Sequence, residues 1–313
     1  MKPAIVVAGS LNMDFVVSVD ELPAPGETVL GRNFQMIPGG KGANQACAAA
    51  KLGGQSVAVR MIGRVGYDVF GDHLKASLSA AGVDVSAVHA TKAQATGVAL
   101  IWVDRAGQNS IVVASGANHE LAAADVEAMR AVFRGARLAL FQLETPLETV
   151  RRALAVAREE GLETILDPAP AQMLPAELLK NVDILTPNET EALRLLGRPP
   201  ARISPAEAIE LAEALRRMGP KTVIVKLGDQ GCLAHDVERR EHFPGFAVEV
   251  TDTTAAGDTF NAALAVSLAE GAPLPHALRF ANAAAAISVT RLGAQASAPS
   301  RREVDAFLER VAR

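Results

Sequence analysis

The sequence predicts an α/β fold with three layers (α/β/α), in which helices cover both faces of a mostly parallel central sheet and a small β-sheet forms a lid. Three observations lead to this prediction. Short apolar runs rich in Val and Ile alternate with stretches of helical period, several of those stretches end in glycine, and two segments depart from the alternation. We expect the 313 residues to form a single domain, residues 1–313.

The alternation locates the elements of the core. Buried strands are expected at the apolar runs 4–10, 56–66, 138–144, 164–170, 182–189 and 222–228. Helices are expected at the stretches 43–54, 68–82, 123–136, 147–161 and 206–219. Ligands bind at the carboxyl ends of the strands in such sheets, so polar residues that follow a strand are candidates for a site.

Two segments alternate apolar and polar residues and have no helical period. Residues 15–40 contain proline–glycine turns, and residues 96–118 consist of two alternating runs around a polar turn, which predicts a hairpin. We expect parts of these segments, about 13–37 and 96–115, to form a lid over the end of the main sheet. The alternative is that they are edge strands of that sheet.

Composition and charge argue against several classes of function. The 31 basic and 35 acidic residues give a net charge of −4 without a long run of either sign, which disfavours a nucleic-acid or membrane-surface partner. The N-terminus lacks the features of a signal peptide, and no apolar run approaches the roughly 20 residues that span a bilayer, so a cytoplasmic protein is expected. Cys47 and Cys232 have no metal-type spacing and are expected to be buried.

The first candidate site is a glycine-rich segment, PGGKGANQACAAAKLGG at 38–54. Its glycines surround Lys41 and precede a helix of small residues, so main-chain N–H groups at the helix N-terminus can approach a ligand closely. The spacing is that of neither a Walker A loop nor a dinucleotide fingerprint, because the first strand is followed by GSLNMD. A purely structural turn is the alternative.

Polar residues after other strands are further candidates. Asn12 and Asp14 follow the first strand and point to the same side if the chain is extended, which suits sugar hydroxyls; a polar turn is the alternative. Asn188 and Glu191 fit a helix capping box, although the same residues could orient a phosphate, water or Mg²⁺. Residues 226–234, KLGDQGCLA, are typical of a hairpin turn, and their amides could instead bind nucleotide phosphates.

The segment TDTTAAGDTFNAALAVSLAEG at 251–271 predicts a helix that begins near Gly257. Ala255 to Asp258 would present free N–H groups in the first turn, which is an anion site. The helix end favours an ionised Asp258, so we expect this carboxylate to be a weak base that can still accept a hydroxyl proton during phosphoryl transfer. A helix cap is the alternative role for Asp258.

Three segments occur together in an order that is similar to the sugar kinases of the ribokinase family: GGKGANQA, DTTAAGDTFNAAL and the tail RFANAAAAISVTRLGAQASAP at 279–299. The resemblance covers essentially the whole chain and implies the ribokinase-like fold, with the β segments as a lid over the sugar and as the contact of a homodimer. It also implies ATP-dependent phosphorylation of D-ribose at its 5-hydroxyl, with Mg²⁺ required and K⁺ activating.

Other functions are weighed against this one. A kinase for another sugar or nucleoside, such as 2-deoxyribose, fructose or adenosine, is the nearest alternative. A non-catalytic sugar-binding protein on the same fold is another, and the missing fingerprint disfavours a Rossmann dehydrogenase.

The resemblance also implies a role for each matching residue. Asp258 would be the base, and the anion hole would consist of Ala255, Ala256 and Gly257. The residues that would hold the sugar are Asn12, Asp14, Gly40, Lys41, Gly42, Ala43, Asn44 and Glu144. The residues that would line the ATP site are Asn188, Lys226, Leu227, Gly228, Asp229, Gln230, Gly231, Gly257 and Asn282, and Glu191 would place Mg²⁺ through water. A monovalent-cation loop would consist of Asp252, Thr254, Ser288, Arg291, Gly293 and Ser297. Lys226 departs from the family pattern, because many relatives have a small polar residue such as threonine there.

Overall fold

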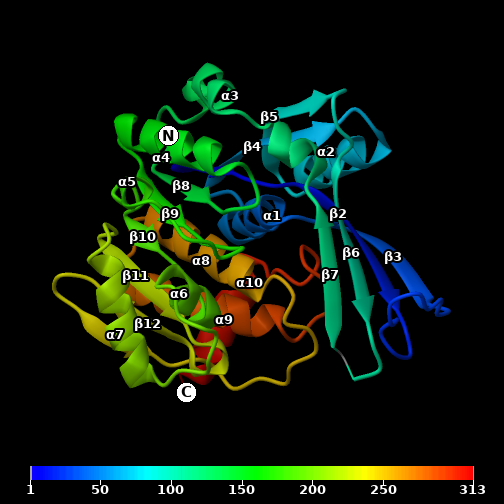
Figure 1. Cartoon of the computed structure of the whole chain (residues 1–313). Helices are drawn as coiled ribbons and strands as arrows, with labels where there is room; N and C mark the ends of the chain where they lie inside the picture. Colours follow the sequence, from blue (N-terminus) through cyan, green and yellow to red (C-terminus); the bar gives the residue numbers. More distant parts are fainter. Residues whose placement is uncertain (1, 107, 313) are drawn as a thin grey trace.

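The computed structural model describes residues 2–106 and 108–312. The strands of the main sheet are β1 (Ala4–Ala8), β4 (Ala58–Gly66), β5 (Val83–Thr91), β8 (Leu138–Phe141), β9 (Glu163–Leu166), β10 (Ile184–Leu185), β11 (Thr222–Lys226), β12 (Cys232–His235) and β13 (Arg240–Phe243). Their order across the sheet is β13–β12–β11–β10–β9–β8–β1–β4–β5 (Figure 1).

The main sheet is parallel except at one edge. Neighbouring strands from β5 through β1 to β11 pair in parallel, whereas β12 and β13 add to β11 in antiparallel orientation. Every residue of β1 and β8 is buried, as expected for central parallel strands that are covered on both faces. The carboxyl ends of seven parallel strands therefore meet along the same edge of the sheet.

Helices cover both faces of this sheet. On one face, a continuous hydrophobic cluster includes residues of α1 (Lys41–Gly53), α2 (Val69–Ala80), α8 (Ala256–Ala269), α9 (Leu274–Ser288) and α10 (Arg301–Val311). On the other face, a second cluster includes residues of α3 (Ala123–Ala128), α4 (Leu147–Glu159), α5 (Ala176–Leu179), α6 (Glu189–Leu195) and α7 (Pro205–Arg216). Three short 3₁₀ turns are η1 (Gly116–Glu120), η2 (Arg130–Val132) and η3 (Gly228–Gln230). The predicted α/β/α sandwich is confirmed.

The two segments without helical period form a sheet of their own. It consists of β2 (Asn12–Ser18), β3 (Arg32–Gly39), β6 (Gly97–Val103) and β7 (Asn109–Ala114), in the order β3–β2–β6–β7. Strands β6 and β7 are the predicted hairpin, and β2 pairs with β6 in parallel. Figure 1 shows these long strands beside the body of the molecule, so they are not edge strands of the main sheet.

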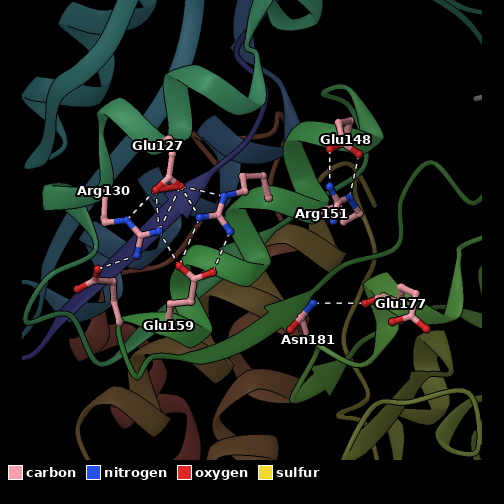
Figure 2. Close-up of polar contacts among 9 residues, drawn as sticks. Glu127, Arg130, Glu148, Arg151, Glu159, Glu177 and Asn181 are labelled. Carbon is pink, nitrogen blue, oxygen red and sulfur yellow. Dashed lines mark hydrogen bonds and ion pairs between the residues drawn. The ribbon is translucent and has the colours of Figure 1, made fainter.

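Ion pairs fasten α3 and η2 to α4 on the face of the sheet opposite α8. Figure 2 shows Arg130 between Glu127 and Glu159, with its Nη2 atom 2.6 Å from Glu127 Oε1 and 2.5 Å from Glu159 Oε2. Arg152 contacts the same two carboxylates. These side chains are partly exposed, so water screens their attraction, and the cluster serves mainly to orient the short helix against α4.

Several local features differ from the sequence-based expectations or complete them. Strands β5 and β13 and helices α9 and α10 were not predicted, and α8 begins at Ala256 rather than at Gly257. Cys47 and Cys232 are free and buried, as predicted. Among the described residues, no helix is both long enough and apolar enough to cross a membrane.

Candidate active site

The carboxyl edge of the parallel strands gathers polar side chains from distant parts of the chain. Each of them lies at the end of a strand or directly after it, as the topology requires. They are Ser10 and Asn12 after β1, Gln142 and Glu144 after β8, Asp167 after β9, Asn188 after β10 and Lys226 at the end of β11. Helices α1 and α8, which pack against each other, both begin at this edge.

The glycine-rich segment is needed for close packing at the start of α1. Gly40 has φ 87°, and a Cβ on it would lie 2.7 Å from the main-chain nitrogen of Asn12. A Cβ on Gly42 would lie equally close to Ser10 N, and one on Gly39 would lie 2.1 Å from Asp14 Oδ2. The glycines therefore let α1 begin directly against the end of β1, which supports the structural interpretation and also brings Lys41 to the site.

Asp258 lies in the first turn of α8 and is 5% exposed. Its Oδ2 atom accepts a hydrogen bond from Asn44 Nδ2 at 3.1 Å, and its Oδ1 atom accepts one from Gln45 Nε2 at 3.0 Å. Both donors belong to the first turns of α1. The carboxylate is therefore held between two helix N-termini by side chains of the glycine-rich segment, rather than serving as a cap of its own helix.

The expectation that Asp258 is a weak base is wrong. Burial raises its pKa from 3.8 to about 6, and the nearby Asp167 adds to this effect. Lys41 and the two amide donors act in the opposite direction but do not outweigh the loss of hydration. A pKa near 6 suits a group that must accept a proton near neutral pH.

Two further charged groups face Asp258. Burial raises the pKa of Asp14 to about 7, and the charges of Glu144 and Asp258 contribute to this rise. Burial alone would lower the pKa of Lys41, but the combined attraction of the surrounding carboxylates raises it. These carboxylates belong to Asp258, Asp167, Glu144 and Glu191. The site therefore holds a cation among acids from four different segments of the chain.

Hydrogen bonds fix the remaining polar groups of the predicted sugar site. Glu144 Oε2 accepts from the main-chain nitrogen of Lys41 at 3.0 Å and from the hydroxyl of Ser10. Asn12 Oδ1 accepts from Asn118 Nδ2 at 2.7 Å, which orients the Asn12 amide. The predicted residues Gly42 and Ala43 are buried in α1 and offer only main-chain groups.

The start of α8 has the geometry of an anion-binding turn. Ala255, which precedes the helix, has φ 57°, and no side chain caps the helix. The amide of Ala256 is directed at the carbonyl oxygen of Thr253 at 3.3 Å, whereas the other first-turn amides have no helical acceptor. A Cβ on Gly257 would lie 3.3 Å from Lys226 Nζ, so the ammonium group of Lys226 lies beside this turn.

The predicted ATP-site residues lie along the outer strands of the same edge. Asn188 and Glu191 form the capping box, with two hydrogen bonds of 2.8 Å, and Asn188 forms a parallel bridge with Lys226. Asn282 Nδ2 donates to the carbonyl oxygen of Phe243, and this same oxygen would clash with a Cβ on Gly231. Leu227 is buried, whereas Gly228, Asp229 and Gln230 form the exposed turn η3.

The predicted cation loop is brought together by Asp252. Its Oδ1 atom accepts from the nitrogen and hydroxyl of Thr254, and its Oδ2 atom accepts from Gly293 N at 2.9 Å. The main chain of residues 251 and 252 is also bonded to Val289 O, next to Ser288. Ser297 bonds within its own turn, and the Arg291 side chain is directed at Glu303. Arg291 can therefore contribute only main-chain atoms to this loop.

Some residues at the site were not predicted from the sequence. Gln45 and Asp167 are buried near Asp258, Gln142 is buried and bonded to Gln45, and Ser10 and Asn118 orient the sugar-site residues. Asp167 directly follows β9, within the run expected at 164–170, so the rule that polar residues after a strand are candidates would have found it. Gln45 is a polar residue within a helix of small apolar residues, which is a weaker signal.

A buried carboxylate beside a positively polarised helix N-terminus, with a lysine ammonium next to the same turn, suits the transfer of a phosphoryl group to a small hydroxyl compound. Comparisons with known proteins give the family. Residues 2–301 match the model of the pfkB family carbohydrate kinases, and the chain therefore belongs to this family.

Similar proteins match the chain over nearly its full length. Ribokinase of Haemophilus influenzae is 42% identical over 309 residues, which cover 99% of both chains. Deoxyribokinase of Salmonella typhi is 34% identical over 97% of this chain and 98% of its own. The solved structure of Arabidopsis thaliana ribokinase complexed with ribose and ATP has a TM-score of 0.88 and 35% identity, and covers 99% of both chains. The resemblance to the ribokinase family is confirmed.

Proposed function

We propose that this protein transfers the γ-phosphoryl group of ATP to the 5-hydroxyl of D-ribose and releases D-ribose 5-phosphate and ADP. The observation that carries the proposal is the position of Asp258, buried between the N-termini of α1 and α8 and held by Asn44 and Gln45. The full-length similarity to a ribokinase, and to a ribokinase structure with both substrates, supports the choice of sugar and of phosphoryl donor.

The site residues have different roles in the reaction. Asp258 accepts the proton of the 5-hydroxyl while that oxygen forms a bond to the γ-phosphorus and the bond from this phosphorus to the β,γ-bridging oxygen of ATP breaks. The negative charge that leaves with ADP is balanced by the proton on Asp258. The anion hole of Ala255, Ala256 and Gly257, together with the Lys226 ammonium, stabilises the charge on the moving group; one such donor contributes about 3 kcal/mol.

The sugar binds to the polar groups between β1, β2 and α1. Asn12, Asp14, Glu144 and the Oδ1 atom of Asn44 offer acceptors, and Lys41 offers donors, so the set matches hydroxyls, which both donate and accept. Gly39 and Gly40 leave the room for this arrangement. The second sheet, about residues 13–37 and 96–115, forms a lid that excludes water, the competing acceptor of the phosphoryl group.

ATP binds along Asn188, Asn282 and the turn from Lys226 to Gly231, and it requires Mg²⁺. Among the described residues, no three His, Cys, Asp or Glu side chains form a metal cluster. This fits Mg²⁺, which keeps several waters and is held by one or two carboxylates and the phosphates of its substrate. Glu191 is the suited carboxylate, because it lies in the first turn of α6 and is bonded to Asn188 of the proposed ATP site. When bound, Mg²⁺ neutralises charge on the ATP phosphates.

A monovalent cation, K⁺, binds in the loop of Asp252, Thr254, Ser288, Arg291, Gly293 and Ser297. The donor set consists of hydroxyl, carboxylate and carbonyl oxygens, which suits such an ion. Asp252 ties residues 252–254, which lead directly into α8, to Gly293. A bound ion would order the amides of the anion hole through this loop. The protein also forms a homodimer through the second sheet, whose strand β7 is exposed along its whole length.

The test is an ADP-release assay with D-ribose, 2-deoxyribose, fructose and adenosine, each with and without K⁺. We expect the highest kcat/KM with D-ribose, and a higher rate with K⁺. The second candidate is a 2-deoxyribose kinase, which the 34% identity to a deoxyribokinase supports. A preference for 2-deoxyribose would replace the proposed substrate, and no ADP release with any of the four acceptors would indicate a non-catalytic sugar-binding protein.

A further inference from the structure

A chain of buried polar side chains connects Asp258 to Lys226. Gln45 Nε2 donates to Asp258 Oδ1 at 3.0 Å and also to Asp167 Oδ2 at 3.1 Å. The other oxygen of Asp167, Oδ1, accepts from Lys226 Nζ at 2.9 Å. Gln45 is 0% exposed and Asp167 is 2% exposed, so water does not compete for the bonds of Gln45, and of these side chains only that of Lys226 is partly exposed.

The orientation of the Gln45 amide is set by Gln142. Gln142 Nε2 donates to Gln45 Oε1 at 2.6 Å, which leaves the Gln45 NH₂ group facing the two carboxylates. If the amide were reversed, its oxygen would face two carboxylates and lose both bonds. Gly9 leaves the space for Gln142, because a Cβ there would lie 2.0 Å from Gln142 Oε1.

The pair of Asp167 and Lys226 places a cation at the phosphoryl side of the site. The ammonium group of Lys226 lies beside Gly257 in the first turn of α8, and its ion-pair partner is Asp167. A lysine side chain has a flexible four-carbon stem, so without Asp167 its charge would be spread over several positions. The ion pair with the buried carboxylate of Asp167 fixes one position.

We propose that Gln45 and Asp167 are positioning residues for phosphoryl transfer: Asp167 fixes the Lys226 ammonium against the first turn of α8, and Gln45 ties this ion pair to Asp258, so that base and cation keep a constant separation. Neither residue touches the reacting atoms; they act through Lys226 and Asp258. The proposal rests on the kinase function proposed above and deepens it.

The two residues act on the Asp258 carboxylate with opposite sign. Charged groups that face Asp258 are Lys41 from α1, Asp14 from β2 and Asp167 after β9, and the neutral donors are Asn44 and Gln45. The Gln45 bond favours the ionised form of Asp258, whereas the charge of Asp167 disfavours it. Loss of the Gln45 bond therefore raises the pKa of Asp258, and loss of the Asp167 charge lowers it.

The experiment compares Gln45→Met with Asp167→Asn, both of which retain the approximate size of the side chain. We expect kcat to fall by about 10- to 100-fold in each, because base and cation are misplaced, with KM for the sugar changed less than kcat. The acid limb of the pH profile of kcat/KM moves to higher pH in Gln45→Met and to lower pH in Asp167→Asn, by roughly one unit. Carboxyl ¹³C NMR of Asp258 reports the same two shifts without any substrate.

Asp183→Asn is the matched control. Asp183 is also a buried carboxylate in an ion pair, with Arg158 and Lys221, but it lies at the amino end of β10. Its substitution lowers stability and leaves the acid limb in place. A double variant, Lys226→Met with Asp167→Asn, should be more thermostable than Lys226→Met alone, which leaves a buried carboxylate unpaired.

The outcomes separate this proposal from the proposed function. If the acid limb and the NMR titration do not move, or move in the same direction in both variants, the positioning proposal is overturned while the kinase function stands. If the wild-type protein releases no ADP, the kinase function fails, and the NMR titration still decides the coupling among Gln45, Asp167 and Asp258. Should Gln45→Met not fold, Gln45→Asn, which keeps an amide but is one methylene shorter, serves in its place with the same expected direction.

Discussion

Asn44 donates a hydrogen bond from Nδ2 to Asp258 Oδ2 across 3.1 Å and thereby joins the first turn of α1 to the first turn of α8. The other polar atom of this side chain, Asn44 Oδ1, is buried and has no hydrogen-bond partner among the described residues. Leaving such an acceptor unpaired costs about 1–3 kcal/mol. A donor on a bound ligand, such as a sugar hydroxyl, would remove that cost.

We expect Asp258→Asn to lower kcat by about 10²- to 10⁴-fold, because the amide cannot accept the hydroxyl proton. The affinity for the sugar should change little, since Asn12, Asp14 and Glu144 remain in place. ADP release measures the first quantity and isothermal titration calorimetry with ribose measures the second. A variant with near-normal turnover would show that Asp258 is not the base.

The rate should depend on pH through Asp258, whose pKa is raised from 3.8 to about 6. The ionised form is the base, so kcat/KM for ribose should rise from about pH 5 to about pH 7 and then level off. Stability has the opposite dependence. Because the folded state binds this proton more tightly than the unfolded chain, the contribution is fully present below about pH 4 and is lost as the pH rises through 6.

Activity between pH 5 and pH 8.5 and thermal unfolding midpoints over the same range check both statements. Asp14, with a pKa of about 7, lies near Asp258 and contributes to stability with the same sign. The two titration steps therefore belong to the Asp14–Asp258 pair rather than to either carboxyl alone. In Asp14→Asn the stability change should be smaller. A kcat/KM that is constant from pH 5 to pH 8.5 contradicts the assignment.

Ala255 precedes α8 with φ 57°, a conformation that costs a residue with a Cβ about 1 kcal/mol. Ala255→Gly should therefore raise the free energy of unfolding by up to about 1 kcal/mol. The matched control is Ala256→Gly, one residue further and inside the helix, which should lower it by about 1 kcal/mol. Urea unfolding measures both. Equal effects of the two changes would mean that the strain at Ala255 is absent.

K⁺ should raise kcat, and Asp252→Ala should abolish this activation, because Asp252 links Thr254 to Gly293 across the cation loop. Rates are compared in KCl and in choline chloride at equal ionic strength. Glu249→Ala, an exposed acid shortly before the loop, is the control and should keep the activation. If Asp252→Ala responds to K⁺ as the wild type does, the ion binds elsewhere or not at all.

The homodimer should depend on the face of the second sheet that carries Asp14. On β7, Ile111 and Val113 lie on this face, and they are 51% and 46% exposed. Exposed apolar residues on neighbouring positions are typical of a contact surface. Ile111→Asp should shift the protein to a monomer in sedimentation velocity, whereas Val237→Asp, at an exposed valine elsewhere, should not. A wild-type protein that sediments as a monomer at tens of micromolar would refute the dimer.

The main features of the fold could be predicted because local pattern and tertiary role agree for most segments. The buried runs at β1, β8 and β11 and the amphipathic pattern of α4 and α7 each have one stable interpretation. Strand β5 is one exception, and β13, α9 and α10 were not predicted either. Strand β5 lies at the edge of the sheet, and its mixture of buried and exposed residues, VDVSAVHAT, lacks the continuous apolar run of the central strands.

Site residues could be predicted from the sequence only where the local pattern indicates a single chemical role. The helix start at 255–258 indicated an anion site from backbone geometry alone, and the structure has an uncapped helix there. The pKa of Asp258 was predicted with the wrong sign, because the helix N-terminus is a local feature, whereas the burial that raises this pKa depends on packing between distant segments. Gln45 was missed for the same reason, because Asp167 and Asp258, to which it donates, are more than 100 residues away in the chain. Asp167, in contrast, directly follows β9, and the strand-end rule would have found it.

Asn12 pairs with Gly39 on one side and with Gly97 on the other, so three of the crossings between the two sheets lie side by side at the first rung of the second sheet. The second sheet is therefore joined to the body of the molecule along this rung. Residues proposed to bind the sugar lie at this rung or directly after it, because Asn12 is part of it and Gly39 leads into Lys41 and α1. A tilt of the second sheet, including one caused by contact with a second subunit, would therefore also move the residues proposed to bind the sugar.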